Sequence, residues 1–213
     1  MTVSQEIIKT TNVLDTVQYI NGLKAIIFDL DDTLYSEKDY IRSGYRKIAE
    51  LFPQIKDTEK QLWNIFLDGK PAVDEFLRQQ TLFSDEVKEK CLVTYRLQKP
   101  NIHLYSGVKE MLMDLRKNYL IGLITDGRPE GQWAKISALK IESLMDEIIV
   151  TDELGGVEYR KPNDAAFRLM ADKMCIDFEH MCYVGDNIQK DFISPQKLGM
   201  RCIWIRNDDG LYV

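Results

Sequence analysis

Residues 24–34 read KAIIFDLDDTL, an apolar run that ends in a cluster of acidic residues. Its first part, Lys24 to Leu30, is apolar on both faces of an extended chain, which is typical of a strand buried inside a parallel sheet. Asp29, Asp31 and Asp32 stand within four residues of one another where this strand ends. In open parallel sheets ligands bind beyond the carboxyl ends of the strands, so the stretch predicts an acidic cleft at that edge.

Four more short runs rich in isoleucine or valine follow along the chain, and amphipathic stretches with helical periodicity separate them. Buried strands that alternate with helices are typical of an α/β fold in which helices cover both faces of a parallel sheet. The sequence therefore predicts a Rossmann-like, doubly wound core. The further strands are expected at 119–125, 147–151, 181–185 and 201–205, and the helices between them at 106–118, 129–139, 163–174 and 188–198.

One interval interrupts this alternation. Almost ninety residues separate the first strand from the second, far more than one crossover helix needs. Helical patterns at about 37–51, 58–67, 72–80 and 85–98 occupy the interval. We therefore expect a small all-helical domain over 36–104, inserted into a core formed by 24–35 and 105–213, with 1–23 as a helical extension before it.

The composition is that of a folded domain that does not bind nucleic acid. Of 213 residues, 45% are hydrophobic, which suffices for a buried core. The formal net charge of −6 argues against nucleic acid as a partner, because phosphate backbones attract basic surfaces. No apolar run approaches the roughly 18 residues that span a bilayer, and the first residues lack the pattern of a secretory signal. We expect neither a membrane nor a nucleic-acid partner.

Cysteine and histidine are sparse. The four cysteines lie far apart without a CxxC pair, which favours reduced thiols and a cytoplasmic location. Only two histidines are present, and neither neighbours a plausible nucleophile. Any chemistry must therefore rest on carboxylates.

Further polar residues stand where other predicted strands end. Thr125, Asp126 and Gly127 follow the second strand, and Asp186 follows the fourth, with Asp191 five residues later. Taken singly, each has an ordinary structural explanation, such as a helix cap or one acid on a helix face. Together, at successive strand ends of one sheet, they indicate a site. Hard oxygen ligands in such density favour magnesium over zinc.

This ensemble resembles the haloacid dehalogenase-like hydrolase superfamily. The resemblance extends from about residue 24 to the end of the chain, with four motifs in the correct order. The matches are DLDDT at 29–33, Thr125 in LITDG, Lys161 in YRKPN, and GDNIQKD at 185–191. Any one of these motifs is weak by itself, and the four in register are specific.

The resemblance implies a role for each acid. Asp29 is expected to attack phosphorus and form a phosphoaspartyl intermediate. Asp31 is expected to protonate the leaving oxygen and later to deprotonate the attacking water. Mg²⁺ is the implied cofactor, held by Asp29, by the backbone carbonyl of Asp31, by Asp186 and, directly or through water, by Asp191.

The resemblance also implies groups that bind the phosphoryl oxygens. Thr125 and Lys161 are expected to hold them, together with the backbone amides around Asp126 and Gly127. Lys161 would also offset the negative charge of the acids and the substrate. Arg128, just beyond this segment, is a candidate for contact with the rest of the substrate.

Several activities within and beyond the family remain open. Halide-cleaving members lack the acid at the position of Asp31, so phosphoester hydrolysis ranks above dehalogenation, and no lysine stands out for the phosphonate-cleaving chemistry. Phosphomutase activity is an alternative, as is a non-catalytic phospho-binding or receiver-like module. The expected partner is a small phosphorylated metabolite, a sugar phosphate or a nucleoside monophosphate, and the oligomeric state is left open.

The inserted helical domain is similar to the cap that many family members carry after the first motif. A cap that closes over the site would exclude water and select the leaving group. Candidate contacts to that group are Tyr35, Arg42, Tyr45 and Arg46. Arg42 and Arg46 fit a solvated helical stripe equally well.

Overall fold

The computed structural model describes residues 6–211 and divides the chain into two compact units. One unit is formed by the chain up to Glu37 together with the chain from His103 onward, and the other is Lys38–Ile102. We call them the core unit and the helical unit. The expectation that the helical unit serves as a cap stays a prediction.

The core unit is built on one six-stranded parallel sheet with the strand order β1-β6-β5-β2-β3-β4. From β2 the chain adds β3 and β4 on one side of this strand, and it then returns to add β5 and β6 on the other side. This arrangement, with β2 inside the sheet, is that of a doubly wound fold. The predicted α/β class is confirmed. The strands are β1 Ile8–Thr10, β2 Ala25–Phe28, β3 Leu120–Thr125, β4 Glu147–Val150, β5 Met181–Gly185 and β6 Arg201–Ile205.

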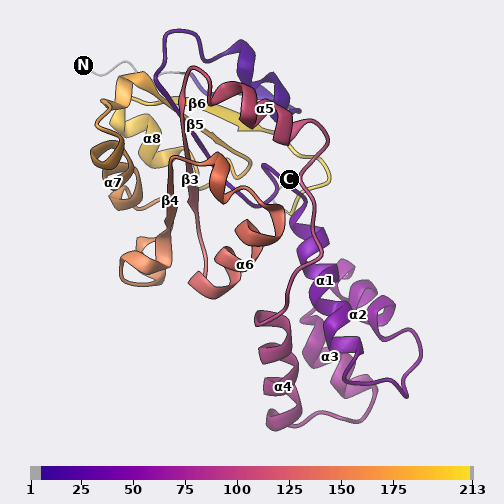
Figure 1. Ribbon diagram of the computed structural model, residues 1–213. Coiled ribbons are helices and arrows are strands. Elements are labelled where there is room, and N and C mark those ends of the chain that lie inside the picture. Colours follow the sequence, from indigo (N-terminus) through magenta and orange to yellow (C-terminus); the bar gives the residue numbers. More distant parts are fainter. Residues whose placement is uncertain (1–5, 212–213) are drawn as a thin grey trace. The chain divides into compact units, whose positions relative to one another are not determined.

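Helices cover both faces of the sheet (Figure 1). Helices α5, Val108–Leu115, and α6, Pro129–Leu139, lie on one side, and α7, Ala165–Met174, and α8, Ile193–Leu198, lie on the other. Strand residues alternate between the two faces, so both faces must be apolar. The short 3-10 helices are η1 Val13–Gln18, η2 Glu142–Leu144, η3 Thr151–Leu154, η4 Val157–Tyr159 and η5 Phe178–His180.

The described part of residues 1–23 contains a short strand and a 3-10 helix where the sequence predicts a helical extension. Residues 8–10 form β1, which pairs in parallel with β6 in the register Ile8 with Ile203. The edge of β6 offers unpaired backbone groups, and Arg206 continues the ladder by donating to the Thr10 carbonyl at 2.7 Å. A 3-10 helix, η1, follows, capped by the side chain of Asn12. Residues 1–5 lie outside the described part of the chain.

The helical unit packs around its own apolar side chains. Its helices are α1 Glu37–Ala49, which begins at the end of the core unit, α2 Thr58–Leu67, α3 Ala72–Gln79 and α4 Asp85–Arg96. Leu62 and Phe76 are fully buried, and the rings of Phe52 and Phe76 meet edge to face at 5.7 Å. Gly44 lets α1 approach α4, because a Cβ there would lie 2.3 Å from the ring of Tyr95. None of the helices described here is long and apolar enough to cross a membrane.

Candidate active site

The acidic residues of the first and fourth motifs meet at the carboxyl end of the sheet. Strands β2 and β5 are neighbours, with Phe28 opposite Val184. The ladder continues one residue further, since the Asp29 amide donates to the Val184 carbonyl at 2.8 Å. Asp29 and Asp186, each directly after its strand, are thereby brought to the same edge, and both are nearly buried. This is the geometry that the sequence predicts for them.

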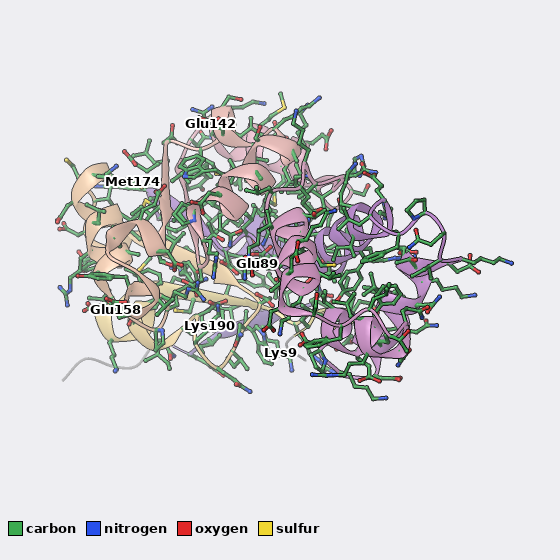
Figure 2. The ribbon with its side chains drawn as sticks, turned by 90° about the horizontal axis from the view of Figure 1, so that it is seen from below. Lys9, Glu89, Glu142, Glu158, Met174 and Lys190 are labelled. Atoms are coloured by element: carbon green, nitrogen blue, oxygen red, sulfur yellow. The ribbon has the colours of Figure 1, made fainter. Side chains whose placement is uncertain are left out.

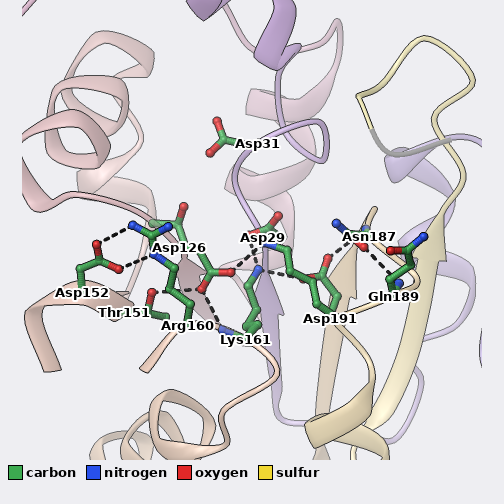
Figure 3. A network of polar contacts seen from close by, with 12 residues as sticks. Asp29, Asp31, Asp126, Thr151, Asp152, Arg160, Lys161, Asn187, Gln189 and Asp191 are labelled. Carbon is green, nitrogen blue, oxygen red and sulfur yellow. Dashed lines mark hydrogen bonds and ion pairs between the residues drawn. The ribbon is translucent and has the colours of Figure 1, made fainter. Parts of the chain in front are cut away.

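Lys161 enters this cluster from the loop before α7. Its ammonium lies 2.6 Å from Asp29 Oδ1 and 2.9 Å from Asp191 Oδ1 (Figure 3). It also donates to Tyr183 Oη at 2.8 Å. The side chain is fully buried. Burial would lower its pKa, but Asp191 and Asp29 hold it well above the ordinary lysine value. Lys161 is therefore a permanent cation between two acids. Tyr183, which orients it, is absent from the sequence prediction because tyrosine in a buried strand usually serves only packing.

Three carboxylates of this cluster form a set that suits a hard cation. Asp29, Asp186 and Asp191 each offer an oxygen within 4.8 Å of the others. Burial and Asp191 raise the pKa of Asp29 to about 7, despite Lys161. Burial, Asp29 and Asp191 raise the pKa of Asp186 to about 9. Lys161 alone thus does not balance the negative charge, and an all-oxygen donor set of this kind fits Mg²⁺.

Asp191 lies in a turn and not on the predicted helix 188–198, because α8 begins only at Ile193. The Asn187 amide donates to Asp191 Oδ2 at 3.0 Å, so the carboxylate folds back onto the loop that carries Asp186. Gly185 makes room for this turn, since a Cβ there would lie 2.5 Å from Asp191 Oδ2. Helix α8 is therefore shorter than predicted at its start, where the turn places the buried carboxylate of Asp191 beside Lys161.

Thr125 ends β3 and is held by a residue that the sequence analysis missed, Gln132 on α6. The Gln132 amide nitrogen donates to Thr125 Oγ1 at 2.9 Å and also reaches the Asp126 carbonyl. Gly127 has φ 140°, and a Cβ there would lie 2.9 Å from the same nitrogen. Gly127 thus allows both the turn after the strand and the approach of Gln132. No motif signals Gln132, since an isolated glutamine on an amphipathic helix carries no pattern.

The Asp126 carboxylate is engaged by other residues of the protein. Oδ1 accepts from Thr151 Oγ1 at 3.0 Å and from the Lys161 amide at 3.1 Å, and Oδ2 pairs with Lys190 at 2.7 Å. Burial would raise its pKa, but Lys161 and Lys190 hold it below the ordinary aspartate value. The side chain of Asp126 thus fixes the loop that delivers Lys161. Arg128 is exposed at the start of α6, and its substrate contact stays a prediction.

Asp31 lies apart from the three-carboxylate cluster. Both of its carboxylate oxygens are 2.8 Å from the ammonium of Lys135, and Oδ2 also accepts from Gln132 at 3.2 Å. Tyr35 Oη donates to Oδ1. Burial would raise the pKa of Asp31, but Lys135 and these hydrogen bonds lower it below the ordinary value. Lys135 is a second functional candidate that the sequence prediction missed, since one lysine on a helix looks like a surface charge.

A cavity of about 220 Å³ opens onto these residues. Its cations are Arg160, which makes a bidentate contact with Asp152 at 2.7 Å, and Lys190, labelled in Figure 2. Most of its lining is acidic, so an anionic ligand needs a cation to enter. The lining residues are Asp29, Asp31, Glu37, Asp126, Arg160, Asp186, Asn187 and Lys190.

Three of the four other sequence candidates for substrate contact, all but Arg46, contact residues within their own units. Tyr35 is fully buried and bound to Asp31. Tyr45 is buried in the helical unit, where its ring lies 6.3 Å from that of Phe66. Arg42 pairs with Glu59 at 3.0 Å. Arg46 is exposed.

Comparisons with known proteins give the site its context. The family model of the haloacid dehalogenase-like hydrolases matches residues 26–205. The glyceraldehyde 3-phosphate phosphatase of Methanocaldococcus jannaschii is 29% identical over 84% of this chain and 82% of its own length. The N-acylneuraminate-9-phosphatase of Rattus norvegicus is 24% identical over 90% of this chain and 86% of its own length.

Solved structures share the fold. A hydrolase of the same family from Bacillus subtilis, crystallised with magnesium, has a TM-score of 0.64 at 18% identity, covering 85% of this chain and 86% of that one. The 2-haloacid dehalogenase of Pseudomonas syringae has a TM-score of 0.58 at 23% identity, covering 85% and 86%. With the family model matching most of the chain, and with curated relatives that are phosphatases, this protein belongs to the haloacid dehalogenase-like hydrolases and is an enzyme of that family.

Proposed function

We propose that the protein is a magnesium-dependent phosphomonoesterase that works through a phosphoaspartyl intermediate on Asp29. The observation that carries the proposal is the buried cluster in which one lysine, Lys161, contacts both Asp29 and Asp191, with Asp186 close by. A permanent cation beside clustered carboxylates, at the carboxyl end of a parallel sheet, suits the binding of a phosphate dianion.

In the first step an oxygen of Asp29 attacks phosphorus, and the bond between phosphorus and the ester oxygen breaks. The leaving alkoxide takes a proton from Asp31, which lines the same cavity. Asp31 must carry that proton when the substrate binds, although Lys135 and the hydrogen bonds to Asp31 favour its carboxylate form. Lys161 donates to the phosphoryl oxygens as charge shifts onto them. Thr125, held by Gln132, is a second group that can donate to these oxygens.

In the second step water attacks the phosphorus of the phosphoaspartyl group. Asp31 accepts a proton from this water, the bond between phosphorus and the Asp29 oxygen breaks, and inorganic phosphate leaves with Asp29 restored. Mg²⁺ would be held by Asp29, Asp186 and Asp191, together with the backbone carbonyl of Asp31, and when bound it neutralises charge on the phosphoryl group.

The substrate class follows from the relatives and from the acid at position 31. Both relatives described above are named for phosphorylated sugars. An alkoxide leaving group needs a proton, which Asp31 supplies, whereas a halide needs none. We therefore propose a small sugar phosphate as substrate.

Phosphate release tests this proposal. Wild type and Asp29→Asn would be compared with Mg²⁺ or EDTA on glyceraldehyde 3-phosphate, other sugar phosphates, nucleoside monophosphates and p-nitrophenyl phosphate. We expect turnover that needs Mg²⁺, is fastest on a sugar phosphate, and falls at least about 10³-fold in the variant. The absence of phosphate release from every ester, or equal rates for the variant and wild type, would refute the assignment. Isomerised sugar phosphate without released phosphate would identify a mutase instead.

A further inference from the structure

Two side chains on one face of α6 converge on Asp31. Gln132 and Lys135 are three positions apart on the helix, so they point the same way. Lys135 contacts both carboxylate oxygens of Asp31 at 2.8 Å, and Gln132 contacts Oδ2 at 3.2 Å. Tyr35 donates to Oδ1 from the other end of the same loop. We call Lys135, Gln132 and Tyr35 the Asp31 clamp.

The charge of Lys135 is not explained by packing. The residue is 6% exposed, and its neighbours on the buried side of α6, Ile136 and Leu139, are apolar. Burying an ammonium group is unfavourable unless it is paired, so an apolar residue would serve a purely packing role better. The structure pairs it with a carboxylate that lines the cavity. The charge of Lys135 acts on Asp31 at hydrogen-bond distance, and it also acts on Glu37, another residue of the cavity lining.

Contact at both oxygens restricts the carboxylate in a way that one hydrogen bond would not. An aspartate side chain rotates about two bonds, and one ammonium bound equally to both oxygens opposes both rotations. Proton transfer in an active site depends on such placement, and a displacement of about 1 Å can cost about 10²-fold in rate.

We propose that Lys135 is a positioning residue, which fixes the carboxylate of Asp31 at the cavity where the leaving oxygen of the substrate arrives. This inference rests on the proposed function, because the role of Asp31 does. Lys135 is not among the residues that line the cavity, so we expect no direct contact between it and the substrate. Its effect must therefore pass through Asp31. In the step that breaks the ester bond, the effect should appear only with substrates whose leaving group needs a proton, whereas the later water step, which also uses Asp31, is common to all substrates.

The test compares Lys135→Met with wild type on glyceraldehyde 3-phosphate and on p-nitrophenyl phosphate, whose nitrophenolate leaves without a proton. We expect kcat on the sugar phosphate to fall about 10- to 100-fold with little change in KM, and the first-turnover rate of nitrophenolate release from the aryl ester to fall less than about threefold, because only the later water step uses Asp31 with that ester. Lys117→Met, which removes an exposed lysine paired with Asp114, is the control and should match wild type on both esters.

A double-variant cycle separates positioning from a general loss of structure. Asp31→Asn with Lys135→Met removes both buried charges together, so it also guards against misfolding of either single variant. On the sugar phosphate the double variant should be no slower than Asp31→Asn alone. Losses that multiply, or a Lys135→Met variant that slows cleavage of both ester bonds equally or of neither, would overturn the inference.

The proposed function fails differently. In that case wild type releases no phosphate, or Asp31→Asn slows the first-turnover release of nitrophenolate as much as it slows cleavage of the sugar phosphate. The role of Lys135 alone would be contradicted by a different result. In that result wild type is active and Asp31→Asn slows mainly the cleavage of the sugar phosphate, but Lys135→Met does not distinguish the two esters.

Discussion

Asp29 and Asp31 stand two positions apart in one loop, yet they belong to different sets of contacts. Asp29 is joined through Lys161 to Asp191, and Figure 3 shows the chain of contacts that links them. Asp31 is drawn apart from this chain in the same view, since its partners come from α6. The strand β2 ends at Phe28, so both acids lie in the loop after it, and Asp32, at φ 51°, turns the chain just beyond them.

The two settings act on the acids in opposite directions. Asp29 is buried among further carboxylates with a lysine that it shares, and its pKa rises to about 7. Asp31 is buried too, but an ammonium contacts both of its oxygens, and its pKa falls. The comparison shows that the balance of charge around a carboxylate, and not burial alone, decides its state.

The largest expected effect comes from Lys161→Met. The variant removes the cation beside Asp29, and kcat/KM should fall by about 10³-fold on both alkyl and aryl phosphates, because phosphoryl binding does not depend on the leaving group. This uniform loss contrasts with the selective loss expected of Lys135→Met. Lys173→Met, in a partly exposed pair with Glu147, is the matched control. A loss confined to alkyl phosphates would show that the two lysines do not have separate roles.

Gly185→Ala should disturb the contacts of Asp29, Lys161 and Asp191 and leave those of Asp31 unchanged. Its Cβ would meet Asp191 Oδ2 at 2.5 Å, so Asp191 must move away from Lys161. We expect turnover to fall about 10- to 100-fold and unfolding free energy to fall by about 1–3 kcal/mol.

Gly122→Ala is the control for that variant. Its Cβ would meet Ile27 Cδ1 at 2.7 Å in the interior of the sheet. It should lose similar stability in urea titrations while keeping the turnover per folded molecule. Equal activity losses in both variants would attribute the effect of Gly185→Ala to the fold and not to Asp191.

Tyr183→Phe tests whether the tyrosine hydroxyl helps to orient Lys161. The ring would still pack against Phe167 at 5.0 Å, so the fold should persist. Lys161 would lose one of its three contacts, and kcat should fall about tenfold on both esters with a thermal midpoint close to wild type. Phosphate release and calorimetry measure the two quantities. An unchanged kcat would mean that Asp29 and Asp191 orient Lys161 without the hydroxyl.

The smallest effect concerns stability. Mg²⁺ at about 100 times its dissociation constant should raise the thermal midpoint by about 5 °C relative to EDTA, because binding to the folded state alone stabilises it. Asp186→Asn should abolish this shift, whereas Asp31→Asn should keep it, since the side chain of Asp31 lies outside the three-carboxylate cluster. A shift that survives in Asp186→Asn would place the cation elsewhere.

Local patterns in the sequence determined much of this protein. Buried strands are recognisable as short apolar runs, and β5 and β6 have the predicted bounds because polar residues mark their ends, His180 and Asp186 around β5 and Arg201 and Arg206 at the two ends of β6. Acids directly after a strand must gather at one edge of a parallel sheet, which is why the sequence alone suffices to place Asp29 and Asp186 together. The four motifs in their order indicated the family.

Only the tertiary structure decided which partner each of these residues has. Lys135, Gln132 and Tyr183 carry no motif, and each is an ordinary member of a helix or strand until the fold turns it toward Asp31, Thr125 or Lys161. The short strand β1 exists because β6 offers it an edge, although its own sequence is weakly patterned. Periodicity in a sequence reports which face of an element is buried, but contacts between distant segments depend on how those faces are packed.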